Sequence, residues 1–247
     1  MAAQEFQCEV KSIRMLTPTV FELAFQTNRP FEFIGGQFAS IVIPGAGPKG
    51  RDLRRAYSIA STPGGSPVEL CIKRVESGPG SQYLYALKPG QVFRAFAPYG
   101  DFIYKKRSGR RVCFIATGTG VAPFRSITQS KDFQASLPIS TLCLFGVREE
   151  SELLYMDDFA KLPFVTWVPM LSQPRTENWN GRLGRVTNYL REQGAKFPWL
   201  ETDYYLCGSG AMIDEVKLIL MGKGVTKDSI HQEIYYKPAK ADGSEKV

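Results

Sequence analysis

The sequence predicts two domains, an N-terminal antiparallel β-barrel and a C-terminal α/β domain with a parallel five-stranded sheet. A chain of 247 residues is long enough for two modest domains, each with its own core. Short strands separated by Gly/Pro turns run to about residue 104, and apolar strands alternating with helical periodicity follow. The basic segment 105–111 lies between the two patterns, so we expect domains at 1–107 and 108–247.

The first half is expected to consist almost entirely of strands, a pattern typical of a barrel or sandwich. The expected strands are 6–15, 20–26, 37–43, 55–60, 68–75 and 92–98. They are bounded by turns such as Gly35-Gly36, Pro63-Gly64-Gly65 and Pro89-Gly90. Residues 81–87 are predicted to form a short helix capped by Ser81.

The second half alternates strands and helices, which is typical of a doubly wound parallel sheet. The expected strands are 111–116, 139–145, 164–171, 204–207 and 231–235, and the expected helices are 121–130, 152–161, 183–192 and 212–223. Residues 239–247 have the composition of a loose polar tail.

Several functional classes are disfavoured by composition. No apolar run approaches the ~20 residues of a membrane helix, and residues 1–5 lack the features of a signal peptide, so we expect a cytoplasmic protein without an integral membrane segment. The five cysteines stand singly, which argues against zinc and against a plant-type iron–sulfur cluster. The single histidine, His231, excludes a multi-histidine metal site. We therefore expect no metal.

The net charge of +7 is compatible with nucleic acid, an anionic membrane surface, phosphorylated cofactors or an acidic protein partner. Basic residues gather mildly at 105–107 and 110–111, but no DNA- or RNA-binding motif accompanies them. A solvated linker is the alternative interpretation of this cluster.

The stretch 54–61, Arg-Arg-Ala-Tyr-Ser-Ile-Ala-Ser, places two arginines, a tyrosine and two serines on one expected strand. Arginine fits a phosphate, tyrosine offers a face for stacking, and serine can bond to a ring heteroatom. An anionic aromatic ligand therefore suits this strand. An edge strand with solvated arginines suits it equally.

Two glycine turns follow expected strands of the second half. In residues 115–123 a strand runs into Gly118 and Gly120, where backbone N–H groups can approach a pyrophosphate, although Pro123 replaces the third glycine of the usual fingerprint. Residues 205–212 form a similar turn. Because ligands bind outside the carboxyl ends of such strands, both turns and Cys207 are expected to line one crevice. A core thiol is an equal alternative for Cys207.

These stretches resemble the ferredoxin–NADP reductase family through four motifs that stand in register along nearly the whole chain. The motifs are R-x-Y-S at Arg55, Tyr57 and Ser58, G-x-x-S at Gly78 and Ser81, G-T-G-x-x-P at Gly118, Thr119, Gly120 and Pro123, and C-G-x-G-x-M at Cys207, Gly208, Gly210 and Met212.

The resemblance implies FAD on the barrel and NADP on the α/β domain, with NAD as the alternative nucleotide. Arg55 would then pair with flavin phosphate, Tyr57 would stack on the isoalloxazine and Ser58 would lie near the flavin N5. The backbone of Gly80 and Ser81 would bind pyrophosphate. The second set of cofactor-binding residues would hold the nicotinamide dinucleotide, namely Gly118, Thr119, Gly120, Pro123, Gly208 and Met212, with Cys207 beside the nicotinamide.

Residues 233–236 resemble the family's closing strand. Glu233 would approach the flavin–nicotinamide contact, and Tyr235 or Tyr236 would cover the outer flavin face, although the chain continues to Val247. Ordinary alternation along a sheet strand is the competing explanation.

Residues after the third α/β strand would select the nucleotide. Several arginines in this region favour NADP, although Gln173 stands where NADP-using members of the family often have arginine. The candidate residues are Ser172, Arg175 and Arg182, with Arg148 as a further arginine.

We interpret the chain as a flavoprotein reductase that exchanges a hydride between NADP(H) and FAD, and single electrons with ferredoxin or flavodoxin. Catalytic roles fall to Ser58, Cys207 and Glu233. Such carriers are usually acidic, which suits a chain with a net charge of +7. One alternative is the NADH-dependent reductase component of an oxygenase or another electron-transfer system. Another is a non-enzymatic module that senses nucleotides. Nucleic-acid binding is disfavoured for lack of interleaved exposed aromatics.

Overall fold

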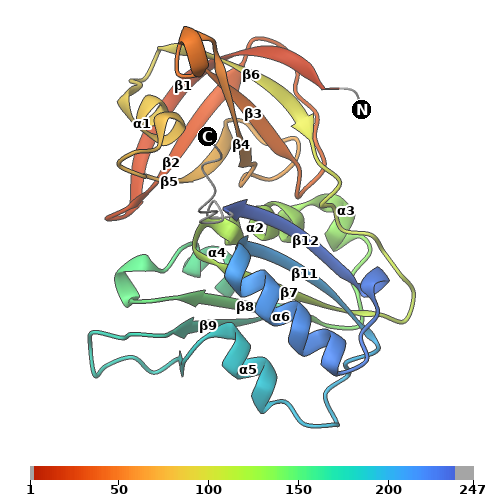
Figure 1. Ribbon diagram of the computed structural model, residues 1–247. Helices are drawn as coiled ribbons and strands as arrows, with labels where there is room; N and C mark the ends of the chain where they lie inside the picture. Colours follow the sequence, from red (N-terminus) through yellow and green to blue (C-terminus); the bar gives the residue numbers. More distant parts are fainter. Residues whose placement is uncertain (1–2, 237–247) are drawn as a thin grey trace, which may run out of the picture.

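A computed structural model describes residues 3–236 of the chain. Figure 1 shows two stacked bodies, with the N-terminal strands in one and the C-terminal sheet with its helices in the other. The two expected halves of the chain therefore fold as separate units that meet at a junction.

The N-terminal body is an antiparallel sheet of six strands in the order β4-β3-β6-β1-β2-β5. The strands are β1 (Gln4–Thr17), β2 (Val20–Thr27), β3 (Phe38–Ile43), β4 (Leu53–Ser58), β5 (Val68–Lys73) and β6 (Val92–Tyr99). The edges meet where Ile59 bridges Leu70 and the Ala60 N–H donates to the Glu69 carbonyl at 2.8 Å. This contact closes the sheet into a barrel and confirms the predicted class.

Side-chain alternation fills the barrel. On β1, Phe6, Cys8 and Val10 are buried, whereas Gln7 and Glu9 between them are exposed. Each large apolar side chain buried in this way contributes about 1.5–3 kcal/mol. The period of two that predicts the strand from the sequence is thus the period that builds its core.

The helix α1 (Pro79–Ala86) differs from expectation at its start. Gly78 is the N-cap, and Ser81 lies inside the first turn, so the prediction that Ser81 caps the helix is wrong. Proline tolerates the first helical position because that residue needs no N–H donor. The Ser81 hydroxyl instead accepts from the Val75 N–H at 3.0 Å and donates to the Gly78 carbonyl at 3.1 Å, which ties the preceding loop to the helix.

The C-terminal body is a parallel sheet in the order β10-β9-β8-β7-β11-β12. The five expected strands are present as β7 (Arg111–Thr117), β8 (Thr141–Val147), β9 (Val165–Leu171), β11 (Thr202–Ser209) and β12 (Ile230–Tyr236), and a two-residue strand, β10 (Arg182–Leu183), adds to the β9 edge. The chain order reverses between β7 and β11, and this is the point at which open parallel sheets bind ligands.

Helices cover both faces of this sheet (Figure 1). One face carries α2 (Ala122–Gln129), α3 (Lys131–Gln134) and α4 (Met156–Ala160), and the other carries α5 (Val186–Glu192) and α6 (Gly210–Gly222). Short 3₁₀ turns are η1 (Pro48–Gly50), η2 (Gly118–Val121), η3 (Glu150–Glu152) and η4 (Lys227–Ser229). Within residues 3–236, none of the helices has both the length and the apolar composition to span a membrane.

Two predicted helices are shorter than expected. The sequence predicts one helix over 152–161, but Tyr155 has a φ of 54°, in the left-handed region, and separates η3 from α4. The helix expected over 183–192 begins only at Val186, because the preceding residues form β10 and Gly184 has a φ of 99°. In both places a single left-handed residue interrupts a helical pattern.

Part of the basic segment between the bodies has a structural role. Arg107 Nη1 donates to Asp203 Oδ1 at 2.7 Å and Arg110 Nη2 donates to the same oxygen at 2.8 Å, and Asp203 is only 2% exposed. The Lys105 N–H donates to the Tyr205 hydroxyl at 3.0 Å. The solvated-linker interpretation therefore does not hold for the two arginines, because a buried carboxylate requires partners of opposite charge.

Candidate functional site

A serine–carboxylate contact joins the two bodies. Ser58 ends β4, is 4% exposed, and donates from Oγ to Glu233 Oε2 on β12 at 2.9 Å. Burial raises the pKa of the Glu233 carboxyl, and the hydrogen bond from Ser58 opposes part of that rise. Two of the three residues expected to be catalytic therefore touch each other, although 175 positions separate them in the sequence.

The first turn of α1 lies directly on β4. A Cβ built at Gly80 would stand 2.5 Å from the Tyr57 hydroxyl and 3.0 Å from Arg55 Cγ, so a larger residue would have to displace these two side chains. Burial raises the pKa of Tyr57 to about 12. The residue is half-buried on the barrel surface.

The two adjacent arginines of this strand differ in what they contact. Arg54 is committed to the barrel, since Nε donates to Ser40 Oγ at 2.9 Å, Nη2 donates to the Tyr99 hydroxyl at 3.0 Å, and the guanidinium lies 4.3 Å from the Phe96 ring centroid. Arg55 is exposed and donates to the backbone carbonyl of Arg54. The structure thus leaves Arg55, the residue selected by the motif, facing solvent beside α1.

The start of α1 has the chemistry of a phosphate site. The first N–H groups of a helix have no acceptor within it, and its dipole favours negative charge there. Gly78, Gly80 and Ser81 form this end of the helix, with the Arg55 side chain against it. The close approach at Gly80 and the neighbouring cation fit the phosphate of a flavin nucleotide.

The two glycine turns interlock at the carboxyl ends of β7 and β11. A Cβ at Gly120 would stand 2.2 Å from the Cys207 carbonyl oxygen, and one at Gly208 would stand 2.2 Å from Thr117 Oγ1. Thr117 Oγ1 also accepts from the Ser209 N–H at 3.3 Å. The turns expected to line one crevice are therefore in direct contact, at the reversal of the strand order.

Helices begin immediately after both turns. Gly118, Thr119 and Gly120 lie in η2, and Pro123 stands in the first turn of α2, where a missing N–H costs nothing. Ser209 caps α6 by accepting from the Met212 N–H at 3.3 Å. Two helix N-termini thus point out of one edge of the sheet, which fits a dinucleotide pyrophosphate.

Cys207 sits at the expected strand end, but its side chain is fully buried. It belongs to the apolar cluster that also contains Ala116 and Val121. Cys207 therefore occupies the position of a core thiol, which is the alternative that the sequence offers. Its proximity to nicotinamide remains a prediction.

The arginines expected to select the nucleotide each pair with a glutamate. Arg148 Nη2 lies 2.8 Å from Glu152 Oε1, and Arg175 Nε lies 2.7 Å from Glu149 Oε2. Hydrogen bonds, led by the one from the Arg175 backbone N–H, lower the pKa of Glu150 to about 2. Arg148 and Arg175 line one pocket of about 290 Å³, together with Pro18, Thr19, Glu149, Ser151 and Glu152.

The remaining two candidates of this region lie outside that pocket. Arg182 pairs with Glu192, and its guanidinium lies 4.8 Å from the Tyr189 ring centroid. The Ser172 hydroxyl donates to the Val147 carbonyl at 3.4 Å. The structure thus brings Arg148 and Arg175 together and leaves Arg182 apart from them.

The closing strand is described only in part. The backbones of Tyr235 and Tyr236 belong to β12, but their side chains lie outside the described residues, so the prediction that one of them covers the flavin stays open.

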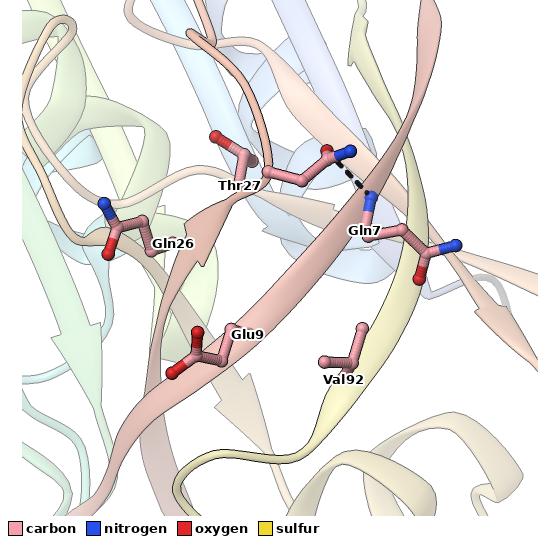
Figure 2. A pocket seen from close by; sticks show the side chains of 6 residues that line it. Gln7, Glu9, Gln26, Thr27 and Val92 are labelled. Carbon is pink, nitrogen blue, oxygen red and sulfur yellow. Dashed lines mark hydrogen bonds between the residues drawn. The ribbon is translucent and has the colours of Figure 1, made fainter.

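A further pocket, of about 360 Å³, lies on the outer barrel surface (Figure 2). It is lined by Gln7, Glu9, Gln26, Thr27, Asn28 and Val92, none of which belongs to the motifs.

Gly120→Ala is expected to destabilise the protein by about 1–3 kcal/mol, the usual cost of overpacking a filled site. The new Cβ would meet the backbone carbonyl of Cys207, which cannot rotate away. Urea unfolding followed by circular dichroism measures this cost. Gly222→Ala is the matched control, because a Cβ there meets nothing within 4 Å. Equal stability of the two variants would contradict the proposed close contact.

Glu233→Gln is expected to change the pH dependence of stability. A carboxyl whose pKa is raised by folding makes the folded state bind protons more tightly, so stability falls as the pH rises through the raised value. Glutamine does not titrate and can still accept from Ser58. The melting temperature of the variant should therefore exceed that of the wild type at about pH 8 and match it at about pH 4.

Scanning calorimetry over that range measures the difference, with Glu201→Gln, at an exposed position, as the control. If the melting temperatures of Glu233→Gln and the wild type differ by the same amount at every pH, the raised pKa of Glu233 does not cause the difference.

Comparison with known proteins identifies both bodies. A model of oxidoreductase FAD-binding domains matches residues 7–104, and a model of oxidoreductase NAD-binding domains matches residues 114–217. The boundary expected between 107 and 108 lies in the interval between these ranges and stays a prediction.

Whole-chain relatives agree with this assignment. Ferredoxin–NADP reductase B of Sorangium cellulosum is 34% identical over 245 residues, covering 94% of this chain and 98% of that protein. The phenol hydroxylase P5 protein of Acinetobacter pittii is 31% identical over 255 residues, covering 98% of this chain and 68% of that protein. The crystal structure of the Amycolatopsis cytochrome P450 reductase GcoB superposes with a TM-score of 0.81 at 25% identity, covering 94% of this chain and 70% of that one.

These relatives agree with the structure of both bodies. The barrel has a helix N-terminus against its arginine, and the sheet has two interlocked glycine turns where its strand order reverses. The chain belongs to the ferredoxin–NADP reductase family and is an oxidoreductase with an FAD-binding and an NAD(P)-binding domain.

Proposed function

We propose that the chain is a reductase that accepts a hydride from a nicotinamide dinucleotide at the Ser58–Glu233 contact and delivers electrons to a separate protein carrier. The single observation that supports it best is this contact, because it joins a buried hydroxyl of the FAD-binding domain to a half-buried carboxyl of the NAD(P)-binding domain. FAD, when bound, supplies the conversion between two-electron and one-electron chemistry. The chain contributes position, hydrogen bonds and exclusion of water.

The flavin-binding part of the proposal rests on β4 and α1. Arg55 and the backbone of Gly80 and Ser81 bind phosphate, and the Tyr57 ring provides the stacking surface. Gly78 ends the preceding loop so that the helix can start beside the arginine. These groups would hold the bound cofactor beside Ser58, the next residue along the strand.

The nucleotide-binding part rests on the glycine turns. Residues 118–120 and Gly208 let the backbone approach the pyrophosphate, and Pro123 and Met212 fix the helices that begin there. A nucleotide held by these turns would lie at the same end of the sheet as the junction, where Glu233 accepts from Ser58. Ser58 is buried and Glu233 is half-buried, so the proton on Ser58 Oγ is directed at the carboxylate or, in the loaded protein, at a bound ring atom.

The identity of the electron carrier is the finer part of the proposal. An acidic ferredoxin or flavodoxin fits a chain with a net charge of +7, and the ferredoxin–NADP reductase of Sorangium supports such a carrier. An oxygenase is the second candidate, because the phenol hydroxylase P5 protein and the P450 reductase are similar over nearly the whole chain. Membership of an oxidoreductase family sets aside the non-enzymatic sensing module.

Ser58→Ala is expected to slow reduction of the bound flavin by about tenfold, the rate equivalent of one hydrogen bond near the reacting atoms. Rapid mixing of the anaerobic FAD-loaded protein with NADPH or NADH, followed by absorbance, measures this step. Ser130→Ala is the control, because Ser130 is about as buried as Ser58 but caps α3 and does not contact Glu233. The proposed function would be overturned if neither nucleotide reduced the flavin bound to the wild-type protein.

Glu149→Gln is expected to raise kcat/KM for NADPH relative to NADH by about two- to fivefold, the strength of one exposed ion pair. The substitution releases Arg175 from its carboxylate and leaves the guanidinium available to a 2′-phosphate. Steady-state rates with both nucleotides measure the ratio. Glu215→Gln, which breaks an ion pair with Arg191 between α5 and α6, should leave it unchanged. An unchanged ratio in Glu149→Gln would remove Arg175 from the nucleotide site.

A further inference from the structure

Helix α2 lies at the junction of the two bodies (Figure 1). Its first turn follows the glycine turn of residues 118–120, and its later side chains bond to the segment that follows Ser58. The Ser126 hydroxyl donates to the Ser61 carbonyl at 2.7 Å, and the Thr62 hydroxyl donates to Gln129 Oε1 at 2.9 Å. One helix therefore connects the nucleotide-binding turn to the flavin-binding strand.

Arg125 is the centre of this attachment. Its Nη1 donates to the Ala60 carbonyl at 2.9 Å and to Glu69 Oε2 at 2.6 Å, and its Nε donates to Asp158 Oδ2 at 2.6 Å. The guanidinium also lies 4.5 Å from the Tyr155 ring centroid. Two of these partners belong to the barrel and two to the α/β body, and only 14% of the Arg125 side chain is exposed.

Tyr155 forms a second bridge beside Arg125. It belongs to the α/β body, and its hydroxyl donates to Glu22 Oε2 on β2 at 3.2 Å. Glu22 is 6% exposed and also accepts from Arg14 at 2.9 Å. The left-handed backbone of Tyr155 is unfavourable for a residue with a Cβ, so the surrounding contacts must hold it there.

From this network we propose that Arg125 is a positioning residue for hydride transfer. By bonding to Ala60 and Glu69, it holds the strand that carries Ser58 at a fixed distance from the helix that carries the nucleotide turn. This inference rests on the proposed function. Hydride transfer needs reacting atoms about 3–3.5 Å apart, so a small change in the separation of the domains has a large effect on rate.

The planar fork of Arg125 is essential to this role. Its Nε and Nη1 reach three acceptors in three directions, whereas a lysine ammonium is a single point charge. Arg125→Lys should therefore recover only part of what Arg125→Ala loses. Ala60 stands two residues after Ser58, so a shift of the guanidinium reaches the Ser58–Glu233 contact through two residues of backbone.

The rate experiment uses the full-length FAD-loaded protein. In Arg125→Ala, the rate of flavin reduction at saturating nucleotide should fall by about tenfold or more, while the nucleotide dissociation constant changes by less than about threefold. Glu69→Gln should lower the rate in the same direction and serves as the second variant if Arg125→Ala does not fold. Arg110→Ala is the matched control, since Arg110 is 17% exposed and bonds to Asp203 within the α/β body alone.

A distance measurement provides a readout that does not depend on activity. Spin labels at Lys88→Cys on the barrel and Leu218→Cys on α6 react selectively, because all five native cysteines are buried. The distribution of distances between the labels should broaden in Arg125→Ala and in Glu69→Gln, and stay narrow in Arg110→Ala.

The outcomes separate this inference from the proposed function. A slower reduction together with a broader distance distribution supports the positioning role. An unchanged rate, or a slower rate with an unchanged distribution, overturns it. Wild-type protein that no nucleotide reduces would overturn the proposed function, and the distance distributions would still decide whether Arg125 fixes the two bodies.

Discussion

The candidate site exists only where the barrel meets the sheet, so its geometry depends on the attachment of helix α2 to the segment that follows Ser58. Neither body alone contains both Ser58 and Glu233. The same helix that follows the glycine turn of residues 118–120 bonds to the barrel through Arg125, Ser126 and Gln129. Under the proposed function, binding and alignment therefore depend on one element, because a shift of α2 displaces the glycine turn of residues 118–120 relative to the segment that follows Ser58.

The charges of the chain are distributed between structure and surface in a way that the net value of +7 does not reveal. Arg107 and Arg110 neutralise the buried Asp203, and Arg125 is enclosed by acids of both bodies. Arg55, in contrast, is exposed beside a helix N-terminus. The cations that remain for ligands or partners are thus those without a buried carboxylate, and the sequence alone cannot distinguish the two groups because their partners lie far along the chain.

Local patterns predicted what local physics determines. The period of two on β1, the strand–helix alternation after residue 110 and the glycine turns all depend on neighbours in the sequence, and the structure has them. The misses involve a competing bond to a neighbouring loop, single backbone angles, or contacts at long range. The cap at Ser81 failed because its hydroxyl bonds to the preceding loop, and the helix over 152–161 failed because Tyr155 adopts a left-handed angle for a contact with Glu22, 133 residues away. The burial of Cys207 likewise depends on which face of the sheet α2 covers.

The junction uses directional hydrogen bonds where an apolar surface would also hold the bodies together. Apolar contacts are non-directional, so an apolar interface would let the two bodies slide along each other. A guanidinium with three acceptors has one good arrangement, because any buried donor or acceptor left unpaired carries the full cost of desolvation. Buried ion pairs add little net stability compared with well-packed apolar residues, so the Arg125 network is better explained by orientation than by stability. A reaction that requires two rings to meet at a fixed separation is the function for which such an interface is suited.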